Sequence, residues 1–435
     1  MLASRLVCWL AASALLLSVA EIGDAAPSAS SRKADLPAGP PVVNARSAIL
    51  MDARTGVVLY EMNADEPSPP ASLAKLMTAH LALQEIEEGK LSLSQVVVPS
   101  PEAWAENMPA HSSLMFLGPN QKLRVDELLT GLVVDSGNDA AVEVAHLIAG
   151  SVPGFVDLMN QEAARLGYRV MHFVDPSGIS ASNVITAREY ADFARQFVLA
   201  HPESLGGFFS VREFSYPLPV NLTGRNHERP ITQLNRNSLL GRYTGVDGLK
   251  TGYIDESGYN MAATAVRDGM RLIAVILGVR REGTASGTSL RAAESASLLD
   301  YGFRTFAEVP VAFREPSPVR VWKGKSRSVT LRADSEPVVV VRKDHASEVH
   351  AVTVQATDVY APVSMGHVLG SVLVTIGSTV VERFPLRAEA SVDRSGLAGR
   401  TLDSIIVFLR GIHPEGAAAS DGARWDRKLV ERRRR

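Results

Sequence analysis

The ten residues from Ala71 to His80 read ASLAKLMTAH and place Ser72 three positions before Lys75. Apolar residues recur at helical spacing as far as Ile86, and two prolines come just before, so the sequence predicts a helix that begins at Ser72. A serine and a lysine at this spacing share one helix face, with Cβ atoms about 5–6 Å apart. A serine hydroxyl needs a neighbouring base to act as a nucleophile, and a lysine is a base only when burial or a second cation lowers its pKa. The pair is therefore either a nucleophile with its base or a helix cap followed by a solvated lysine.

A second serine–lysine pair, SSRK at residues 30–33, lies in a different setting. Residues 27–41 are rich in proline, alanine and serine, which is typical of a flexible leader. A nucleophile needs rigid surroundings that fix its geometry. The sequence therefore favours Ser72 and Lys75 as the reactive pair.

The composition is that of an ordinary globular protein. The chain has 435 residues, of which 46% are hydrophobic and 21% charged, so two domains with a sizeable core are expected. The formal net charge of −2 gives no reason to expect nucleic acid as a partner.

Residues 1–26 have the layout of a secretory signal peptide. Arg5 is followed by an apolar run from Leu6 to Val19 and then by small residues near Ala25. The alternative, a transmembrane anchor, needs about 20 apolar residues, and this run is shorter. Cleavage would remove Cys8, the only cysteine, so the exported chain would have neither a disulfide nor a thiolate. Its chemistry would then use oxygen or nitrogen.

Two further motifs follow along the chain. Ser136-Gly-Asn138 is a Ser-x-Asn, which by itself is most simply a turn that caps the next helix. Lys250-Thr251-Gly252 is either an edge strand with a turn glycine or a strand on which glycine lets a ligand approach closely. Ser-x-x-Lys, Ser-x-Asn and Lys-Thr-Gly, in this order, form the motif set of penicillin-binding proteins and class A β-lactamases.

The chain resembles the D-alanyl-D-alanine carboxypeptidases, low-molecular-mass penicillin-binding proteins that trim peptidoglycan stem peptides. The resemblance runs from about Val42 to Phe303, through ILMDARTGVVLYEMNADE, PASLAKLMTAHLALQEI, SGNDAAVEVAHLIAGS, FVDLMNQEAARLG, HFVDPSGI, VDGLKTGY and RLIAVILGV. A weaker likeness around APVSMGHVLGSVLVTI covers the later part of the chain. It implies an α+β fold: a β-lactamase/transpeptidase-like catalytic domain at residues 42–303, in which helices pack on an antiparallel sheet, and a small, mainly β domain at residues 304–393.

Residue patterns predict elements of the same kinds. The predicted elements of the first domain are a β-hairpin at residues 49–60, helices at 125–134, 140–149 and 155–166, and strands at 260–266 and 271–279. From residue 309 to residue 390 the pattern changes to short alternating strands separated by Gly, Pro and Asp, which predicts the mainly β domain.

The resemblance assigns the catalytic steps to three residues. Ser72 would attack the carbonyl of the penultimate D-alanine and form an acyl-enzyme, while Lys75 accepts its proton. Ser136 would pass a proton to the departing D-alanine amine. Water would then release the shortened peptide.

The resemblance also implies a set of substrate-binding residues. Asn138 would hold a substrate amide, and Lys250 would attract the terminal carboxylate and help to keep the catalytic lysine uncharged. Thr251 would hydrogen-bond the same carboxylate. Tyr253, which follows Gly252, would supply one backbone N–H of the oxyanion hole, and the nucleophile would supply the other.

Two positions depart from the family pattern. Ala74 stands where threonine is common, and Tyr253 stands where some relatives have histidine. Neither change removes a catalytic group, so both bear on fine specificity only. No metal or cofactor is expected, since the sequence has no His-Glu-x-x-His motif.

Residues 396–412 predict an amphipathic C-terminal helix. Its apolar stripe comprises Ala398, Leu402, Ile405, Ile406, Leu409 and Ile412, with Val407 outside the stripe. A helix this short cannot span the hydrocarbon but can lie in the membrane interface, as the anchors of the family do, or it can pack on its own domain. The basic tail at residues 413–435 either attracts anionic lipid or is a disordered solvated segment.

The sequence therefore predicts a serine-type D-Ala-D-Ala carboxypeptidase that β-lactam antibiotics also acylate. We expect it in the periplasm, on the outer face of the inner membrane. A β-lactamase shares the acylation step, but its class A form needs a glutamate with an asparagine four residues later, and no such pair is evident between Ser136 and Lys250. A non-catalytic cell-wall-binding module is the third hypothesis, and the intact set of catalytic residues argues against it.

Overall fold

The computed structural model describes residues 39–224, 228–281, 283–412 and 414. The predicted signal peptide at residues 1–26 lies outside the described residues. So do residues 27–38 of the leader and all of the basic tail except residue 414.

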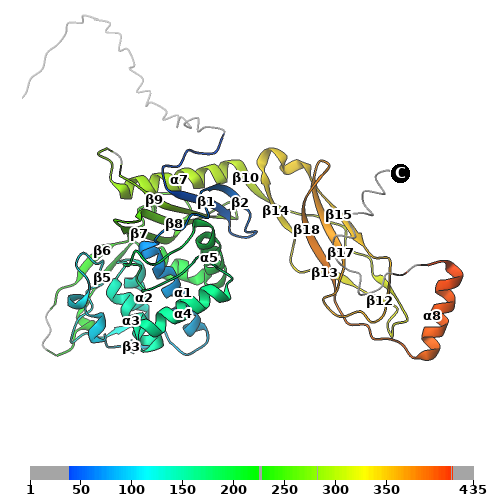
Figure 1. The fold of residues 1–435 in the computed structure, drawn as a ribbon, viewed down its shortest axis with the longest axis horizontal. Helices are drawn as coiled ribbons and strands as arrows, with labels where there is room; N and C mark the ends of the chain where they lie inside the picture. Colours follow the sequence, from blue (N-terminus) through cyan, green and yellow to red (C-terminus); the bar gives the residue numbers. More distant parts are fainter. Residues whose placement is uncertain (1–38, 225–227, 282, 413, 415–435) are drawn as a thin grey trace, which may run out of the picture. The chain divides into compact units, whose positions relative to one another are not determined.

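A five-stranded antiparallel sheet lies at the centre of the part of the chain that carries the three motifs (Figure 1). Its strands, in spatial order, are β2 (Val58–Met62), β1 (Ser47–Asp52), β9 (Met270–Val279), β8 (Gly258–Arg267) and β7 (Val246–Ile254). β1 and β2 are the predicted hairpin, and β8 and β9 are the two predicted strands. Alternate side chains of β9 pack into two different hydrophobic cores, Ile273 and Val275 into one and Leu272 and Ile276 into the other. Because side chains alternate along a strand, both faces of this sheet are covered.

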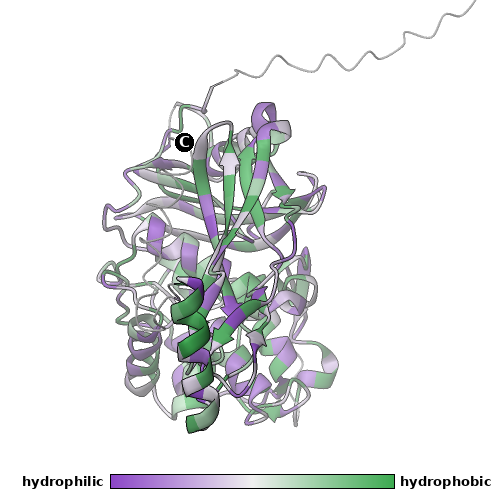
Figure 2. Ribbon diagram, turned by 90° about the vertical axis from the view of Figure 1, so that its right-hand side faces the viewer, coloured by the Kyte–Doolittle hydropathy of each residue, from purple (hydrophilic) through white to green (hydrophobic). Residues whose placement is uncertain are grey.

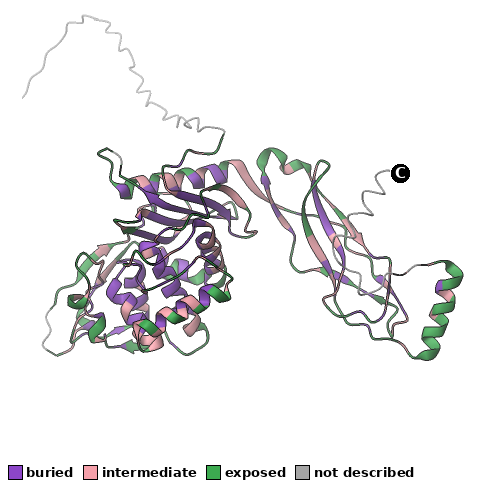
Figure 3. Ribbon diagram, viewed as in Figure 1, coloured by how far each residue is buried: buried purple, intermediate pink, exposed green. Residues whose placement is uncertain are grey.

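Helices supply the cover on the two faces of the sheet (Figure 1). They are α1 (Lys75–Glu87), α2 (Val125–Val133), α3 (Asn138–Ala149), α4 (Val152–Arg165) and α5 (Ala187–Ala200) in one layer and α7 (Gly287–Thr305) in the other. The predictions at residues 125–134, 140–149 and 155–166 are confirmed as α2, α3 and α4, whereas α5 and α7 lie outside the predicted set. Figure 3 shows that buried positions concentrate in the sheet and in the inner sides of these helices.

Short elements connect the sheet and the helices. They are β3 (Val96–Val97) paired with β4 (Leu123–Arg124), β5 (Glu213–Tyr216) paired with β6 (Ile231–Leu234), η2 (Pro101–Ala103), η3 (Ala105–Asn107), α6 (Pro202–Ser204), η4 (Leu205–Phe209) and η5 (Pro219–Asn221).

The helix predicted to begin at Ser72 begins instead as a 3₁₀ turn, η1 (Ala71–Ala74), and becomes α-helical at Lys75. Ala71 has a φ of +52°, which a non-glycine residue rarely adopts and which is incompatible with an α-helix. Backbone from two sides presses on Ala71. A Cβ atom at position 178 would lie 1.8 Å from the Ala71 carbonyl oxygen, and one at position 252 would lie 3.1 Å from the Ala71 Cβ. Tertiary packing therefore sets the geometry of this turn.

A buried polar chain joins α1 to α4 and to the end of α5. His80 Nδ1 lies 2.8 Å from His201 Nε2, while the outer ring nitrogens lie 3.0 Å from Glu162 Oε1 and 2.6 Å from Glu87 Oε1. Ionised carboxylates only accept hydrogen bonds, so each outer nitrogen carries a proton, and the contact between the inner nitrogens needs one more. Three protons on four ring nitrogens give the pair one positive charge. Burial lowers the pKa of His80.

The later part of the chain is mainly β, as predicted. Its strands are β10 (Phe306–Pro310), β11 (Val319–Trp322), β12 (Ser328–Val329), β13 (Leu331–Ala333), β14 (Val338–Arg342), β15 (Val349–Gln355), β16 (Asp358–Tyr360), β17 (Val368–Ile376) and β18 (Thr379–Ala388), and a 3₁₀ turn, η6 (Lys343–Glu348), precedes β15. The largest sheet in this part of the chain has four strands in the order β13–β18–β17–β15. Valine side chains of these strands, such as Val321 and Val372, form a core of their own.

The C-terminal helix α8 (Leu397–Arg410) carries apolar residues along its length (Figure 2) and is largely exposed (Figure 3). The exposed apolar residues are Leu397, Leu402, Ile405, Phe408 and Leu409. Val407, which the predicted stripe leaves out, is the one buried residue of α8, and the Asp403 carboxylate accepts a hydrogen bond from the backbone N–H of Lys323. Among the described residues, no single helix has the length and apolarity to cross a membrane, although α3 and α4, bent by 83°, would pass that test as a pair.

Candidate active site

The first two predicted motifs meet at the Nζ atom of Lys75. Its Nζ atom donates to Ser72 Oγ at 3.0 Å, to Asn138 Oδ1 at 2.7 Å and to the backbone carbonyl of Ser177 at 2.8 Å. Lys75 is 1% exposed, so its amine is enclosed, whereas Ser72 is half-buried. Lys75 thus lies within hydrogen-bond distance of Ser72, where a base would have to lie.

Ser136 forms a second hydroxyl–amine pair with Lys250. Lys250 Nζ donates to Ser136 Oγ at 2.8 Å, and both residues are buried. Ser136 lies in the turn between α2 and α3 with a φ of +59°, an uncommon conformation for serine. Such strained residues persist where the surrounding structure fixes them, and they cluster at functional sites.

Gly252 lets strand β7 approach η1 closely. A Cβ atom at this position would lie 2.7 Å from the carbonyl oxygen of Pro70 and 3.1 Å from the backbone nitrogen of Ser72. Tyr253 is the next residue on the same strand, so its backbone N–H follows directly after the point of contact. A glycine is therefore required where the predicted oxyanion hole lies. Thr251, on the other side of Gly252, is buried next to Lys250.

Burial controls the charge of both lysines. It lowers the pKa of Lys75 to about 7. Attraction by Asp175 and Asp139 opposes this change, and repulsion from Arg236 adds to it. Burial also lowers the pKa of Lys250 well below its ordinary value, and the ammonium of Lys75 lowers it further. The resemblance implied that Lys250 is a cation that helps to keep Lys75 uncharged. In the structure the repulsion between the two lysines lowers the pKa of Lys250. The pKa of Lys75 is lowered first by burial and then by Arg236.

A buried carboxyl lies next to Ser136. Asp135 is 1% exposed, and its Oδ1 atom has no hydrogen-bond partner among the described residues. Burial and the neighbouring Asp139 raise its pKa to about 8, although Arg236 and Lys250 oppose the rise. Asp135 is therefore uncharged near neutral pH.

The loop at residues 175–183 was not among the predicted site residues, yet it positions Lys75. The Asp175 carboxylate accepts from the backbone N–H groups of Ser177, Gly178 and Ser180, and from the side-chain amide of Asn183. Burial alone would raise the pKa of Asp175, but these hydrogen bonds hold it below its ordinary value. The ordered turn aims the Ser177 carbonyl at Lys75. The Asp-Pro-Ser-Gly sequence is a turn pattern that could have indicated this loop.

A second carboxylate fixes the loop that approaches Asn138. Asp139 accepts from the backbone N–H groups of Met115, Phe116 and Leu117. The loop in turn contacts the motif residue, because Asn138 Nδ2 donates to Ser112 Oγ at 3.1 Å. Asp139 and Ser112 are thus supporting residues that the motif pattern did not indicate.

The arrangement is suited to acyl transfer. It combines a hydroxyl with an uncharged amine, a second hydroxyl with a second amine, and backbone N–H groups at a glycine. Among the described residues there is no group of three or more His, Cys, Asp or Glu side chains that could hold a metal ion.

Comparison with known proteins identifies the family. The sequence profile of the D-alanyl-D-alanine carboxypeptidase family matches residues 34–281, and that of the penicillin-binding protein 5 C-terminal domain matches residues 312–394. The chain belongs to the D-alanyl-D-alanine carboxypeptidase family. It is 34% identical to D-alanyl-D-alanine carboxypeptidase DacC of Escherichia coli over 84% of this chain and 89% of the relative. It is 33% identical to DacA of Haemophilus influenzae over 86% and 91% of the two chains.

Solved structures of carboxypeptidase relatives share the fold. Penicillin-binding protein 5 from Haemophilus influenzae matches with a TM-score of 0.73 at 32% identity, over 82% of this chain and 99% of that protein. Penicillin-binding protein D2 from Listeria monocytogenes, solved in its ampicillin-bound form, matches with a TM-score of 0.51 at 27% identity, over 61% of this chain and 99% of that protein. The resemblance seen in the sequence, the α+β fold and the mainly β second domain are thereby confirmed.

The two departures from the carboxypeptidase pattern lie in different environments. Ala74 is fully buried in η1. Tyr253 is 47% exposed, its ring packs at a tilt against Tyr259 with ring centroids 4.3 Å apart, and its hydroxyl donates to Asp255. The ring of Tyr253 therefore lies at the surface.

Proposed function

We propose that this protein is an exported serine carboxypeptidase that removes the terminal D-alanine from peptidoglycan stem peptides through an acyl-enzyme on Ser72. One observation carries the proposal: the enclosed amine of Lys75, whose pKa is lowered to about 7, lies 3.0 Å from Ser72 Oγ. An uncharged lysine at this distance can accept the serine proton near neutral pH.

Acylation uses the residues that the structure brings together. Ser72 Oγ attacks the carbonyl carbon of the penultimate D-alanine, and its proton moves to Lys75 Nζ. The negative oxygen of the tetrahedral intermediate accepts from the backbone N–H groups of Ser72 and Tyr253. The C–N bond then breaks, and the leaving amine takes a proton through Ser136, which the Lys250 amine hydrogen-bonds.

Substrate binding depends on the terminal carboxylate. In this proposal Lys250 and Thr251, which are consecutive and buried on β7, hold it. A bound carboxylate also favours the charged form of Lys250, which in the free site is disfavoured by burial and by Lys75. Asn138 is placed to contact a substrate amide, and water then hydrolyses the ester on Ser72.

β-Lactams fit the same chemistry. Attack by Ser72 opens the lactam ring, and the ring nitrogen remains attached to the acyl group, so no amine departs. The relative solved with ampicillin supports this part of the proposal. A long-lived adduct distinguishes the carboxypeptidase from a β-lactamase, which would turn the drug over quickly.

The site of action is proposed to be the periplasmic face of the inner membrane. Support comes from the signal-peptide pattern of residues 1–26 and from the exposed apolar face of α8, where Phe408 is 84% exposed. Sedimentation with vesicles of anionic phospholipid tests the anchor. Replacing Ile405 and Leu409 by glutamate should release the protein, and replacing the exposed Thr401 and Ser404 by glutamine should not.

Two assays test the activity itself. The chain that starts at residue 27 should release D-alanine from a peptide ending in D-Ala–D-Ala, and a fluorescent penicillin should label it at Ser72. Ser72→Ala should abolish both, while Ser92→Ala, at an exposed serine, should retain both. Folded protein that is not labelled would favour the cell-wall-binding module, and D-alanine release by Ser72→Ala would overturn the proposal.

A further inference from the structure

The hydroxyl of Thr78 donates to the backbone carbonyl of Pro176 at 2.6 Å and so joins α1 to a loop 98 positions away. Both residues are buried, and Thr78 lies three residues after Lys75, on the same side of α1. We propose that Thr78 is a positioning residue for acylation, which holds the carbonyl of Ser177 against Lys75. The lone pair of the lysine amine is thereby aimed at Ser72. The inference rests on the proposed function and gives a role to a residue outside the three motifs.

The hydrogen bonds around the lysine amine decide where its lone pair points. Asn138 Oδ1 and the Ser177 carbonyl lie 2.7 and 2.8 Å from Lys75 Nζ, and both oxygens only accept hydrogen bonds. An uncharged amine has two N–H groups and one lone pair. When the two N–H groups are donated to these two oxygens, the lone pair is left facing Ser72 Oγ, which lies 3.0 Å away. Both oxygens are therefore needed if Lys75 is to accept the serine proton.

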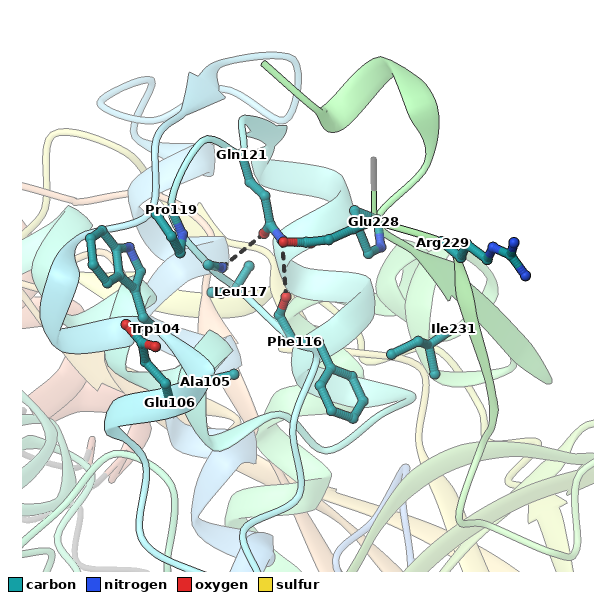
Figure 4. Close-up of a pocket in the computed structure, with 12 residues that line it drawn as sticks. Trp104, Ala105, Glu106, Phe116, Leu117, Pro119, Gln121, Glu228, Arg229 and Ile231 are labelled. Carbon is teal, nitrogen blue, oxygen red and sulfur yellow. Dashed lines mark hydrogen bonds between the residues drawn. The ribbon is translucent and has the colours of Figure 1, made fainter. Parts of the chain in front are cut away.

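The first of these oxygens is fixed by a braced loop. Asn138 Nδ2 donates to Ser112 Oγ at 3.1 Å, which keeps the amide oxygen turned toward Lys75. The loop continues from Ser112 to the wall of a pocket of about 390 Å³, which Figure 4 shows. There the side chain of Gln121 donates to the carbonyl of Phe116 at 3.3 Å (Figure 4). The amide oxygen is therefore held without any contact from α1 other than the lysine itself.

The second oxygen belongs to the backbone, and Thr78 supplies the hydrogen bond next to it. The carbonyls of Pro176 and Ser177 are consecutive along the chain, and they accept from Thr78 and Lys75 respectively. A threonine hydroxyl within a helix can bond a carbonyl of its own helix, whereas that of Thr78 is donated to the loop. Without it, the buried Pro176 carbonyl would lose the one hydrogen bond that it makes among the described residues, which is costly. The loop would then shift and carry the Ser177 carbonyl with it.

Loss of this contact changes the pKa of Lys75 in a defined direction. An ammonium makes stronger hydrogen bonds than a neutral amine, so withdrawing the Ser177 carbonyl disfavours the charged form and lowers the pKa. The charged groups that face Lys75 come from four segments: Asp175 on the loop, Asp139 on α3, Arg236 after β6 and Lys250 on β7. Asp175 raises the pKa of Lys75, so movement of the loop away from the lysine lowers this pKa further. The other three groups lie outside the loop.

The pH dependence of acylation tests the proposal. The second-order rate at which a fluorescent penicillin labels Ser72 is measured between pH 5 and pH 9 in the wild type, in Thr78→Val and in Thr78→Ser. Thr78→Val has the shape of threonine without the hydroxyl. It should lower the rate at pH 9 about ten- to a hundredfold, because the lone pair is no longer aimed. It should also move the midpoint of the acid limb to lower pH by about half a pH unit. Thr78→Ser keeps the hydroxyl and should restore both.

Thr264→Val is the matched control. Thr264 is also fully buried, and its hydroxyl donates to a backbone carbonyl of the central sheet, that of Leu272, at 3.0 Å. This variant should lose thermal stability and keep the wild-type midpoint. A wild-type midpoint in Thr78→Val, or the same shift in Thr264→Val, overturns the inference and leaves the proposed function standing. If Thr78→Val does not fold, Thr78→Ala should show the shift, and an unshifted midpoint there is equally decisive. A wild type that penicillin does not label overturns the proposed function and the inference with it.

Discussion

Nζ of Lys75 lies 2.7 Å from Oδ1 of Asn138, which joins the first motif to the second across 63 positions of sequence. The same amide donates to Ser112, so the orientation of Asn138 is fixed from both ends. The lysine amine is thus held by neutral oxygen atoms, and no carboxylate hydrogen-bonds it among the described residues. This environment is suited to a lysine that must lose its proton near neutral pH.

Asn138→Asp should slow acylation at neutral pH by placing a negative charge against Lys75. The charge raises the pKa of Lys75, and since only the uncharged amine is a base, the acid limb of the acylation rate should move to higher pH. We expect at least a tenfold loss at pH 7 with partial recovery at pH 9, measured as the second-order rate of penicillin labelling. Asn160→Asp, on α4, is the matched control. An unchanged pH profile in Asn138→Asp would argue against this contact.

Gly252→Ala should impair the site without unfolding the protein. The added methyl group would meet the Pro70 carbonyl at 2.7 Å, so either η1 or β7 must shift and carry Ser72 N away from Tyr253 N. Losing one oxyanion donor costs about 10²–10³ in rate. We expect a loss of that order in D-alanine release, with a thermal transition close to that of the wild type. Gly206→Ala, where a Cβ meets nothing within 4 Å, should retain full activity; equal activity of the two variants would contradict the prediction.

Asp135→Asn should stabilise the fold near neutral pH. The native carboxyl, whose pKa is raised to about 8, keeps a proton that the unfolded chain loses above about pH 4. The native state therefore binds more protons between these values, and wild-type stability falls as pH rises through the window. Asparagine removes this dependence. In urea unfolding, the free energy of unfolding of the variant should exceed that of the wild type by about 1–3 kcal/mol at pH 7.5 and by little at pH 4.5. A variant that is less stable than the wild type at pH 7.5 would refute the assignment.

His80→Gln should make the stability of the fold less sensitive to acid. The pH dependence that His80 causes is opposite in sign to that caused by Asp135. Burial lowers the pKa of His80, so below about pH 6.5 the unfolded chain gains a proton that the native ring resists. A fourth proton on the His80–His201 pair would also set two N–H groups against each other. Wild-type stability should therefore drop on acidification from pH 7.5 to pH 5, by about 1 kcal/mol more than that of the variant. Equal drops in urea unfolding would show that the pair does not act in this way.

The sequence predicted the elements whose side-chain pattern is strong. The β1–β2 hairpin, helices α2–α4 and strands β8 and β9 all have an apolar period that local interactions already favour. The three motifs likewise identified Ser72, Lys75, Ser136, Asn138 and the strand from Lys250 to Tyr253, because their order and setting match a known set. The structure brings these residues into one site.

The remaining features depend on contacts between distant parts of the chain. The 3₁₀ geometry of η1 arises because Gly178 and Gly252 both press on Ala71, which no pattern around Ser72 can indicate. Asp175 and Arg236 affect Lys75 from loops remote in sequence, and the cause of the lowered pKa is mainly burial, a tertiary property. The predicted stripe of α8 includes Leu402, Ile405 and Leu409, which are exposed, and Val407, which the stripe leaves out, is buried. The exposed Phe408 was not part of the predicted stripe, because its side of the helix depends on what α8 packs against.

The most direct test of the account is the rate of Ser72 acylation by a fluorescent penicillin between pH 5 and pH 9, in the wild type, in Lys75→Arg and in the control Lys122→Arg. Because the Lys75 amine must be uncharged and its pKa is about 7, the wild type and the control should share an acid limb with a midpoint near that value. Lys75→Arg, whose guanidinium stays protonated, should lose at least about 10³ in rate at every pH. A wild-type rate that is flat across this range, or acylation of Lys75→Arg at the wild-type rate, would contradict the claim that Lys75 activates Ser72.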